Sequence, residues 1–201
     1  TIQEDFQTWQ ERSLSGYDVL YLFVDGLYVK LHRDRDEKQP VLIAYGILGD
    51  GRKVLLHVGV GDRESYQACL GYLRDMTERG LRVPLLYCSD DCPGLRKALK
   101  AVWPRSMPQK CQAHKLRNIL SKLPRGVQTE IKKQIHAVFY AKDHETGLKR
   151  GRALIEAYED RYPQAMECLA KSLEECLTCL KLPEAHRRRV RTTNGLERLI
   201  E

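Results

Sequence analysis

Three acidic residues that lie far apart along the chain, Asp25, Asp90 and Glu197, have the setting of a shared metal site. Each stands where a strand is predicted to end or a helix to begin, so its carboxylate can leave the core while the backbone stays rigid. The string Cys111-Gln-Ala-His114 lies between the second and third acid, within a strongly basic stretch. Carboxylates that converge beside positive charge are what metal-assisted phosphoryl transfer on nucleic acid requires.

Each acid also has a purely structural interpretation. Asp25 precedes a glycine, which is a common turn pair. Asp90 or Asp91 can cap the helix that follows. Asn194 and Glu197 have the spacing of a capping box. Capping does not explain why all three acids occur in this order beside a basic block, but spacing alone does not decide between the two interpretations.

The Cys111 and His114 pair begins a predicted helix. A zinc site would need two more ligands, and none stands at an obvious spacing. His114 can instead orient a carboxylate or contact a phosphate, or it can be an exposed imidazole at a packed helix start. The seven cysteines, in a chain without a recognisable secretion signal, indicate reduced thiols and a cytoplasmic protein.

The positive charge is regional. The formal net charge is +7, and residues 96–133 hold eleven Lys or Arg and one acid, so the rest of the chain is slightly acidic. A solvated helical face usually mixes signs, so this block favours a polyanionic partner, with nucleic acid first. The apolar runs are strand-sized and fall short of the roughly 20 residues that span a bilayer, which excludes a membrane protein.

The elements that would position the acids follow from hydrophobic periodicity and turn residues. The sequence predicts strands at 18–25, 41–48, 53–60, 83–88 and 106–110, helices at 62–79 and from Pro93 to about 102, and a helical pattern over 111–182 interrupted at Pro124, Gly147 and Pro163. Three antiparallel strands, a helix, a strand, a helix and a strand match a ribonuclease-H-like α/β fold: a mixed five-stranded sheet flanked by helices. In that fold the middle of the first strand and the end of the fourth lie side by side, which would bring Asp25 and Asp90 together.

The same pattern predicts the organisation of the chain. Residues 1–15 form a lead-in segment and residues 16–122 the catalytic core. Residues 123–190 form an all-helical insertion, and residues 191–201 begin the helix that carries the third acid.

Several strings, taken together, make the family recognisable. They are Val24-Asp25-Gly-Leu-Tyr-Val-Lys30, Gly46-Ile-Leu-Gly-Asp-Gly51, Glu64-Ser65, Arg79-Gly80-Leu81, Ser89-Asp90-Asp-Cys-Pro-Gly-Leu95, Gln109-Lys-Cys-Gln-Ala-His-Lys-Leu-Arg-Asn118, Tyr162-Pro163 and Arg191-Thr-Thr-Asn-Gly-Leu-Glu197. The chain resembles the catalytic region of Mutator-like bacterial insertion-sequence transposases of the DDE class. The combination of CxxH, RN and TTNxxE carries the resemblance.

The resemblance implies a catalytic triad of Asp25, Asp90 and Glu197 that holds two Mg²⁺ or Mn²⁺ ions. Cys111 and His114 match the family's C(2)H signature, and Asn194 belongs to the TTN run before the last acid. It also implies metal-dependent cleavage and strand transfer on transposon ends and target DNA, a homodimer in the synaptic complex, and a nucleoid-associated location. The bases expected to bind DNA are Lys115, Arg117, Arg187, Arg188, Arg189 and Arg191.

The chain departs from the family pattern at Gly26, where alanine is usual, at Cys69, where tryptophan is common, and at Asp91, where glycine is usual. The family also carries an N-terminal DNA-binding region and a catalytic helix that continues further. The resemblance therefore implies an excised or incomplete core that folds as the catalytic domain but transposes poorly or not at all by itself. Two alternatives remain: a nuclease that cuts without joining, and an inactive DNA-binding remnant.

Overall fold

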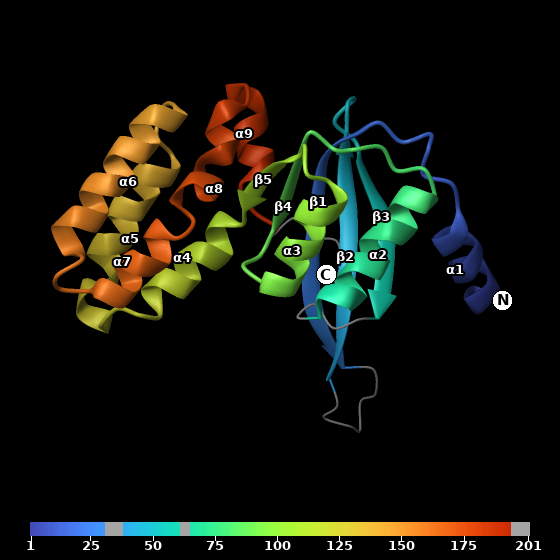
Figure 1. The fold of residues 1–201 in the computed structure, drawn as a ribbon, viewed down its shortest axis with the longest axis horizontal. Helices are drawn as coiled ribbons and strands as arrows, with labels where there is room; N and C mark the ends of the chain where they lie inside the picture. The colour runs from blue at the N-terminus through green and yellow to red at the C-terminus, as the bar shows by residue number, and fades with distance from the viewer. Residues whose placement is uncertain (31–37, 61–64, 194–201) are drawn as a thin grey trace. The chain divides into compact units, whose positions relative to one another are not determined.

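The computed structural model describes residues 1–30, 38–60 and 65–193. These residues form two compact units, one that extends to Met107 and one that begins at Pro108 (Figure 1). The first unit is built on a β-sheet and the second is helical. The second unit begins at Pro108, within the last strand of the sheet, and the start of a helical insertion at residue 123 stays a prediction.

The sheet is mixed and has five strands in the order β3-β2-β1-β4-β5. The strands are β1 (Val19–Lys30), β2 (Lys38–Leu48), β3 (Lys53–Val60), β4 (Leu86–Ser89) and β5 (Met107–Lys110). β1, β2 and β3 form an antiparallel meander, and β4 pairs with β1 in parallel. The predicted five-stranded mixed sheet is therefore confirmed.

A glycine turn fixes the hairpin between β2 and β3. The amide of Gly51 donates to the carbonyl of Leu48 over 2.9 Å, and Gly51 has a φ of 85°, a conformation that glycine adopts without steric cost. The Asp50 carboxylate accepts a hydrogen bond from the amide of Arg52. The predicted turn at Gly49-Asp50-Gly51 is confirmed.

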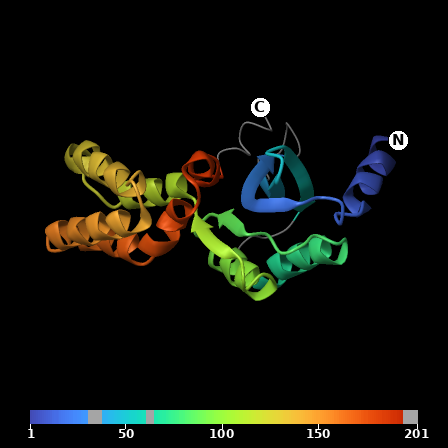
Figure 2. The ribbon, with the colours of Figure 1, turned by 90° about the horizontal axis from the view of Figure 1, so that it is seen from above.

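Two helices cover one face of the sheet, as Figure 2 shows. They are α2 (Tyr66–Glu78) and α3 (Pro93–Val102). Leu22 and Val24 of β1 share a buried apolar core with Leu73 of α2 and Leu95 of α3. Because successive side chains of a strand point to opposite faces, the alternate residues of β1 lie on the other face of the sheet.

A pair of stacked aromatic rings lies on that other face. Phe23 of β1 stacks on Tyr45 of β2 with ring centroids 4.4 Å apart, and both rings are buried. Asp25 is the next residue of this row. The acidic residue thus continues a hydrophobic row, on the face opposite to α2 and α3.

The amino-terminal segment is a helix, α1 (Ile2–Glu11), which the sequence pattern described only as a lead-in. Its start has a capping box in which Thr1 and Glu4 exchange hydrogen bonds. Its end is joined to β3, because Gln10 Nε2 donates to the Val58 carbonyl over 2.6 Å. No residue of α1 is buried, although its apolar residues recur at helical spacing.

A buried polar cluster joins β3 to α2. The Nδ1 atom of His57 lies 2.9 Å from Arg79 Nη2 and 3.0 Å from Asp75 Oδ2, and Arg79 Nε donates to Asp75 Oδ2 over 2.8 Å. The Tyr72 hydroxyl donates to the His57 carbonyl. Burial lowers the pKa of His57 to about 4, against the raising effect of Asp75, so this imidazole is neutral near pH 7.

The cluster predicts a loss of stability in mild acid. Unfolded His57 binds a proton below its ordinary pKa of 6.5, whereas the folded imidazole resists protonation down to about 4. Protons therefore favour the unfolded state between these values, and the His57 contribution should fall by about 2 kcal/mol from roughly pH 7.5 to pH 5. Urea unfolding across this range should show a smaller slope against pH for His57→Gln than for the wild type. Equal slopes would assign the effect to other groups.

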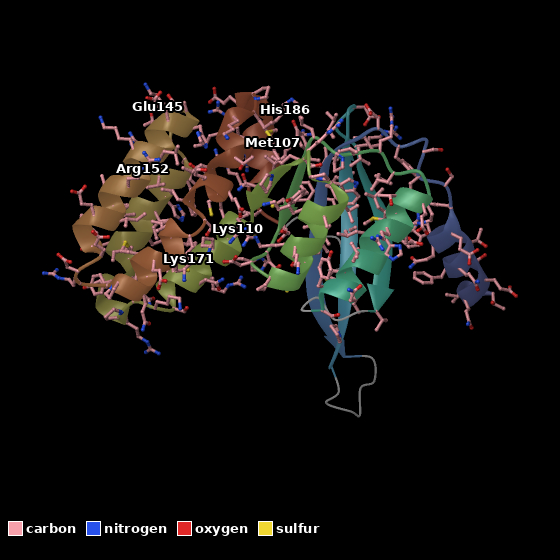
Figure 3. All side chains as sticks on the ribbon, viewed as in Figure 1. Met107, Lys110, Glu145, Arg152, Lys171 and His186 are labelled. Carbon is pink, nitrogen blue, oxygen red and sulfur yellow. The ribbon has the colours of Figure 1, made fainter. Side chains whose placement is uncertain are left out.

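After the last residues of β5, the described part of the second unit is helical. Its helices are α4 (Gln112–Leu120), α5 (Arg125–Phe139), α6 (His144–Tyr158), α7 (Pro163–Ala170), α8 (Leu173–Leu177), the 3₁₀ helix η1 (Thr178–Lys181) and α9 (Glu184–Val190). Pro124 and Pro163 stand at helix starts, as predicted. Charged side chains such as Glu145 and Arg152 of α6 are exposed (Figure 3).

The predicted interruption at Gly147 is wrong. Gly147 lies within α6, whose start is instead capped by Asp143 through a 2.7 Å bond from the Thr146 amide. A Cβ atom on Gly147 would stand 3.1 Å from side-chain atoms of both Leu177 and Leu180. The glycine therefore serves close packing between helical segments rather than a turn.

Candidate active site

The register between β1 and β4 places Asp25 beside Asp90. The two strands are parallel, and Val24 pairs with Ser89 as the last pair of the ladder. Asp25 and Asp90 each follow one member of that pair, so they occupy neighbouring positions on the same face. Neighbouring strands lie about 4.8 Å apart. Two carboxylates that are 65 residues apart in sequence thus become neighbours at the carboxyl end of β4.

Both side chains are buried and held by local hydrogen bonds. Asp25 is 4% exposed and Asp90 8%. Asp25 Oδ1 accepts from the amide of Gly26 at 2.9 Å, and Asp90 Oδ1 accepts from the amide of Cys92 at 3.1 Å. These bonds restrict the orientation of both carboxylates before any ligand binds.

The turn interpretation of Asp25 is wrong. β1 continues through Asp25 and Gly26 to Lys30, and Gly26 remains paired with Leu42 of β2. An acid in the middle of a long, continuous strand has no role in a turn. Its presence in a hydrophobic row therefore requires another explanation.

Asp90 and Asp91 differ in their surroundings. The N-cap of α3 is Cys92, without a side-chain cap, and Asp90 contributes only its bond to the Cys92 amide. Asp91 is half-buried, and its Oδ1 lies 3.8 Å from Arg96 Nη1. Of these two acids, only Asp90 follows Ser89 directly and so lies at the strand end beside Asp25.

The third predicted acid, Glu197, lies outside the described residues, and so does Asn194. Within residues 1–30, 38–60 and 65–193, no three His, Cys, Asp or Glu side chains are grouped as a metal site. The described part of the chain therefore supplies two of the three expected ligands.

The CxxH pair lies in the helical unit, at the start of α4. Cys111 is the N-cap of α4 and is 1% exposed. Its Sγ accepts hydrogen bonds from both the amide and the hydroxyl of Thr193, each at 3.4 Å. Burial raises the pKa of Cys111, but the hydrogen bond and charge of His114 outweigh it and leave the pKa below its usual value. His114 therefore offsets the effect of burial on this sulfur.

Three of the six predicted DNA-binding bases are exposed. They are Arg117 of α4 and Arg188 and Arg189 of α9. Lys115 is 3% exposed instead, and its Nζ donates to the Cys168 carbonyl over 3.3 Å. Its ammonium thus contributes to packing of the helical unit.

Arg187 and Arg191 also bind backbone carbonyls of their own unit. Arg187 donates through Nε to Leu182 and through Nη1 to Lys142, over 2.8 and 2.7 Å. Arg191 is buried, donates to the Phe139 carbonyl, and lies 4.3 Å from the centroid of the Tyr140 ring. The run of arginines therefore divides into two that face solvent and two that tie α9 to neighbouring segments.

Two buried glutamines near the CxxH pair were not singled out from the sequence. Gln109 and Gln112 both donate through Nε2 to the Cys176 carbonyl, over 3.0 and 2.7 Å, and Gln109 Oε1 accepts from the Cys179 amide. They satisfy backbone groups of α8 and η1 that helix ends leave without partners. The two glutamines beside Cys111 are the signal in the sequence, because a buried glutamine needs hydrogen-bond partners for its amide group.

None of the helices in the described residues has the length and apolar character needed to cross a membrane. A family model described as "Transposase, Mutator family" matches residues 1–201.

The chain is also similar to curated insertion-sequence transposases. It is 32% identical over 195 residues to the transposase for IS6120 of Mycolicibacterium smegmatis, covering 97% of the chain and 60% of that protein. It is 32% identical to the transposase for IST2 of Acidithiobacillus ferrooxidans, covering 96% of the chain and 66% of that protein. For the transposase for ISRM5 of Rhizobium meliloti the identity is 33%, covering all of the chain and 50% of that protein. The chain thus spans between half and two thirds of the length of these relatives.

Proposed function

Because the chain belongs to the Mutator family of transposases, we propose that it forms the catalytic part of a DDE transposase that cleaves and joins DNA when an insertion sequence moves. The observation that carries this proposal is the placement of Asp25 beside Asp90 by the register of β1 and β4. Two neighbouring carboxylates on one face of a sheet are stabilised when they share a cation or a proton. Shared cation binding accounts for both acids at once, whereas a turn does not account for Asp25, which lies within β1.

The fold within this proposal is ribonuclease-H-like. The strand order β3-β2-β1-β4-β5, with an antiparallel meander followed by a parallel strand, supports it. So does the position of the acids, one in the central strand and one after the neighbouring strand. A helical unit that begins at Pro108 would then be the insertion that precedes the last acid.

The residues present fit Mg²⁺ or Mn²⁺, because both ions prefer carboxylate oxygens and Asp25 and Asp90 offer two side by side. Glu197 would complete the set for two ions. When bound, such a pair supplies activation of a water or 3′-hydroxyl and stabilisation of the leaving oxygen. Asp25 and Asp90 would hold their carboxylates toward the site through the bonds from Gly26 and Cys92.

DNA would be the partner, as transposon ends and target, with the protein acting as a homodimer that holds two ends in the bacterial cytoplasm at the nucleoid. Exposed bases in each unit support the nucleic-acid part of this proposal. They include Lys97, Lys100 and Arg105 in the first unit and Arg117, Lys122, Arg125, Lys132, Lys133, Arg188 and Arg189 in the second.

A strand-transfer assay tests the proposed function. The full-length transposase that contains this chain is incubated with a labelled transposon end, a target plasmid and Mg²⁺. We expect both cleaved ends and products in which the 3′ end is joined to target. Cleavage without joining, even from a pre-cut end, would favour a nuclease, and DNA binding without either product would favour an inactive remnant.

Neutralising Arg188 and Arg189 should weaken DNA binding without affecting the fold. Each exposed cation that contacts a phosphate releases about one counterion, so the slope of log affinity against log salt should decrease by about two in the double variant R188Q/R189Q. Fluorescence anisotropy over a salt series measures the slope. The control is R152Q, which removes an exposed arginine from α6 of the same unit. An unchanged slope in R188Q/R189Q would remove α9 from the DNA interface.

A further inference from the structure

The start of α4 is hydrogen-bonded to the last described residues of the chain. Cys111 Sγ accepts from the backbone amide and from the hydroxyl of Thr193, although the two residues are 82 positions apart. Both are almost fully buried, at 1% and 0% exposure. A sulfur with two donors from one residue fixes both the backbone and the side chain of that residue.

A backbone bond reinforces this contact. The amide of Gln112 donates to the carbonyl of Arg191 over 2.9 Å. Gln112 is the first residue of α4, where amides have no acceptor within the helix. Three hydrogen bonds therefore hold residues 191–193 against the start of one helix. The side chain of Arg191 adds a bond to the carbonyl of Phe139 at the end of α5.

The chemistry of the sulfur suits this role better than a reactive one. A thiol is a weak acceptor and a thiolate a stronger one. His114, one turn along α4, lowers the pKa of Cys111, which strengthens the sulfur as an acceptor. A sulfur that is 1% exposed has no access to a substrate, so it is neither a nucleophile nor an open metal ligand.

We propose that Cys111 is a positioning residue of the transposase, because its sulfur fixes Thr193, the residue from which the chain continues to Glu197. Only three residues separate Thr193 from Glu197. This inference rests on the proposed function, in which Glu197 is the third carboxylate. In this proposal the CxxH string supplies the sulfur of Cys111, and the TTN string supplies Thr193, which that sulfur holds in place.

Three variants of the full-length transposase test the inference. Cys111→Ala removes the acceptor, Cys111→Ser retains a smaller one, and Thr193→Val removes the hydroxyl donor while it keeps the amide. Cys179→Ala is the matched control, because it removes another fully buried thiol from the same unit. Thermal unfolding and DNA affinity are measured for all four, so that a general loss of structure is recognised.

The first readout does not depend on activity. Amide hydrogen exchange at Thr193, whose amide donates to the Cys111 sulfur, should accelerate by about tenfold or more in Cys111→Ala, less in Thr193→Val and Cys111→Ser, and not in Cys179→Ala. The second readout is the half-saturating concentration of Mn²⁺, measured by binding and by DNA cleavage. It should rise by about tenfold in Cys111→Ala, which is within the range found when a residue that orients a metal ligand is removed.

The outcomes separate the two proposals. Unchanged exchange and unchanged Mn²⁺ binding in Cys111→Ala overturn the positioning role, whatever the enzyme does. An equal rise of the exchange rate and of the half-saturating Mn²⁺ concentration in Cys179→Ala also overturns the positioning role, since the effect then results from the loss of any buried thiol. A wild type that neither binds Mn²⁺ nor cleaves DNA contradicts the proposed function, while the exchange measurement still decides whether Cys111 holds Thr193.

Discussion

Asp90→Asn should abolish metal-dependent cleavage and joining while DNA binding remains nearly unchanged. The amide keeps an oxygen that can accept the hydrogen bond from Cys92, so the start of α3 is retained. The negative charge beside Asp25 is lost. We expect a rate loss of about 1,000-fold or more, beyond the roughly 10- to 100-fold that follows removal of a residue that only orients a ligand.

Asp91→Asn is the matched control for this experiment. It makes the same chemical change at the next residue, which is half-buried and lies 3.8 Å from Arg96 instead of continuing the face of Asp25. Its activity should stay within a few-fold of the wild type. Single-turnover cleavage of a labelled transposon end measures both variants. Full activity in Asp90→Asn, or a complete loss in Asp91→Asn, would contradict the assignment of the site.

Arg191→Gln should destabilise the helical unit without changing the salt dependence of DNA binding. The buried guanidinium donates to the Phe139 carbonyl and lies over the Tyr140 ring. Losing a buried bond from a charged donor, together with the ring contact, should reduce the free energy of unfolding by about 3 kcal/mol. Urea unfolding followed by circular dichroism measures this loss.

Arg188→Gln provides the opposite result and serves as the control. This neighbour on α9 is exposed, so its replacement should leave the unfolding free energy within about 0.5 kcal/mol of the wild type. It should reduce the salt slope of DNA binding instead. If Arg191→Gln altered the salt slope and left stability unchanged, Arg191 would belong to the DNA interface, as the resemblance implied.

The sheet could be predicted because its signals are local. Strand-length apolar runs and the glycines near Asp50 identify the meander, and the switch to helical spacing after β3 identifies α2. The adjacency of Asp25 and Asp90 followed only from the order of the elements. Its register, with Val24 opposite Ser89, required the structure.

The role of each base was harder to predict, because charge alone does not show which side of a helix faces the core. Lys115 shares a helix face with Gln112 and Ile119, and all three are buried in α4. Spacings of three and four residues carry that information, whereas charge alone indicates only an exposed face. Gly147 is hard to predict for a similar reason, since a glycine that permits close packing and one that ends a helix look the same in a sequence.

Cys111 and Thr193 lie close to the points where the chain enters and leaves the helical unit, and we call these two residues the neck of the unit. Their hydrogen bonds hold the entering and leaving segments together within the unit itself. A segment whose two ends meet can be exchanged without stretching the chain on either side. The helical unit can therefore be replaced as a single segment. Chimeras that take residues 111–193 from a relative should fold when both neck residues come from the same parent, and should fail more often when the neck is mixed. In such chimeras the helical unit is replaced while the sheet with its two aspartates stays constant.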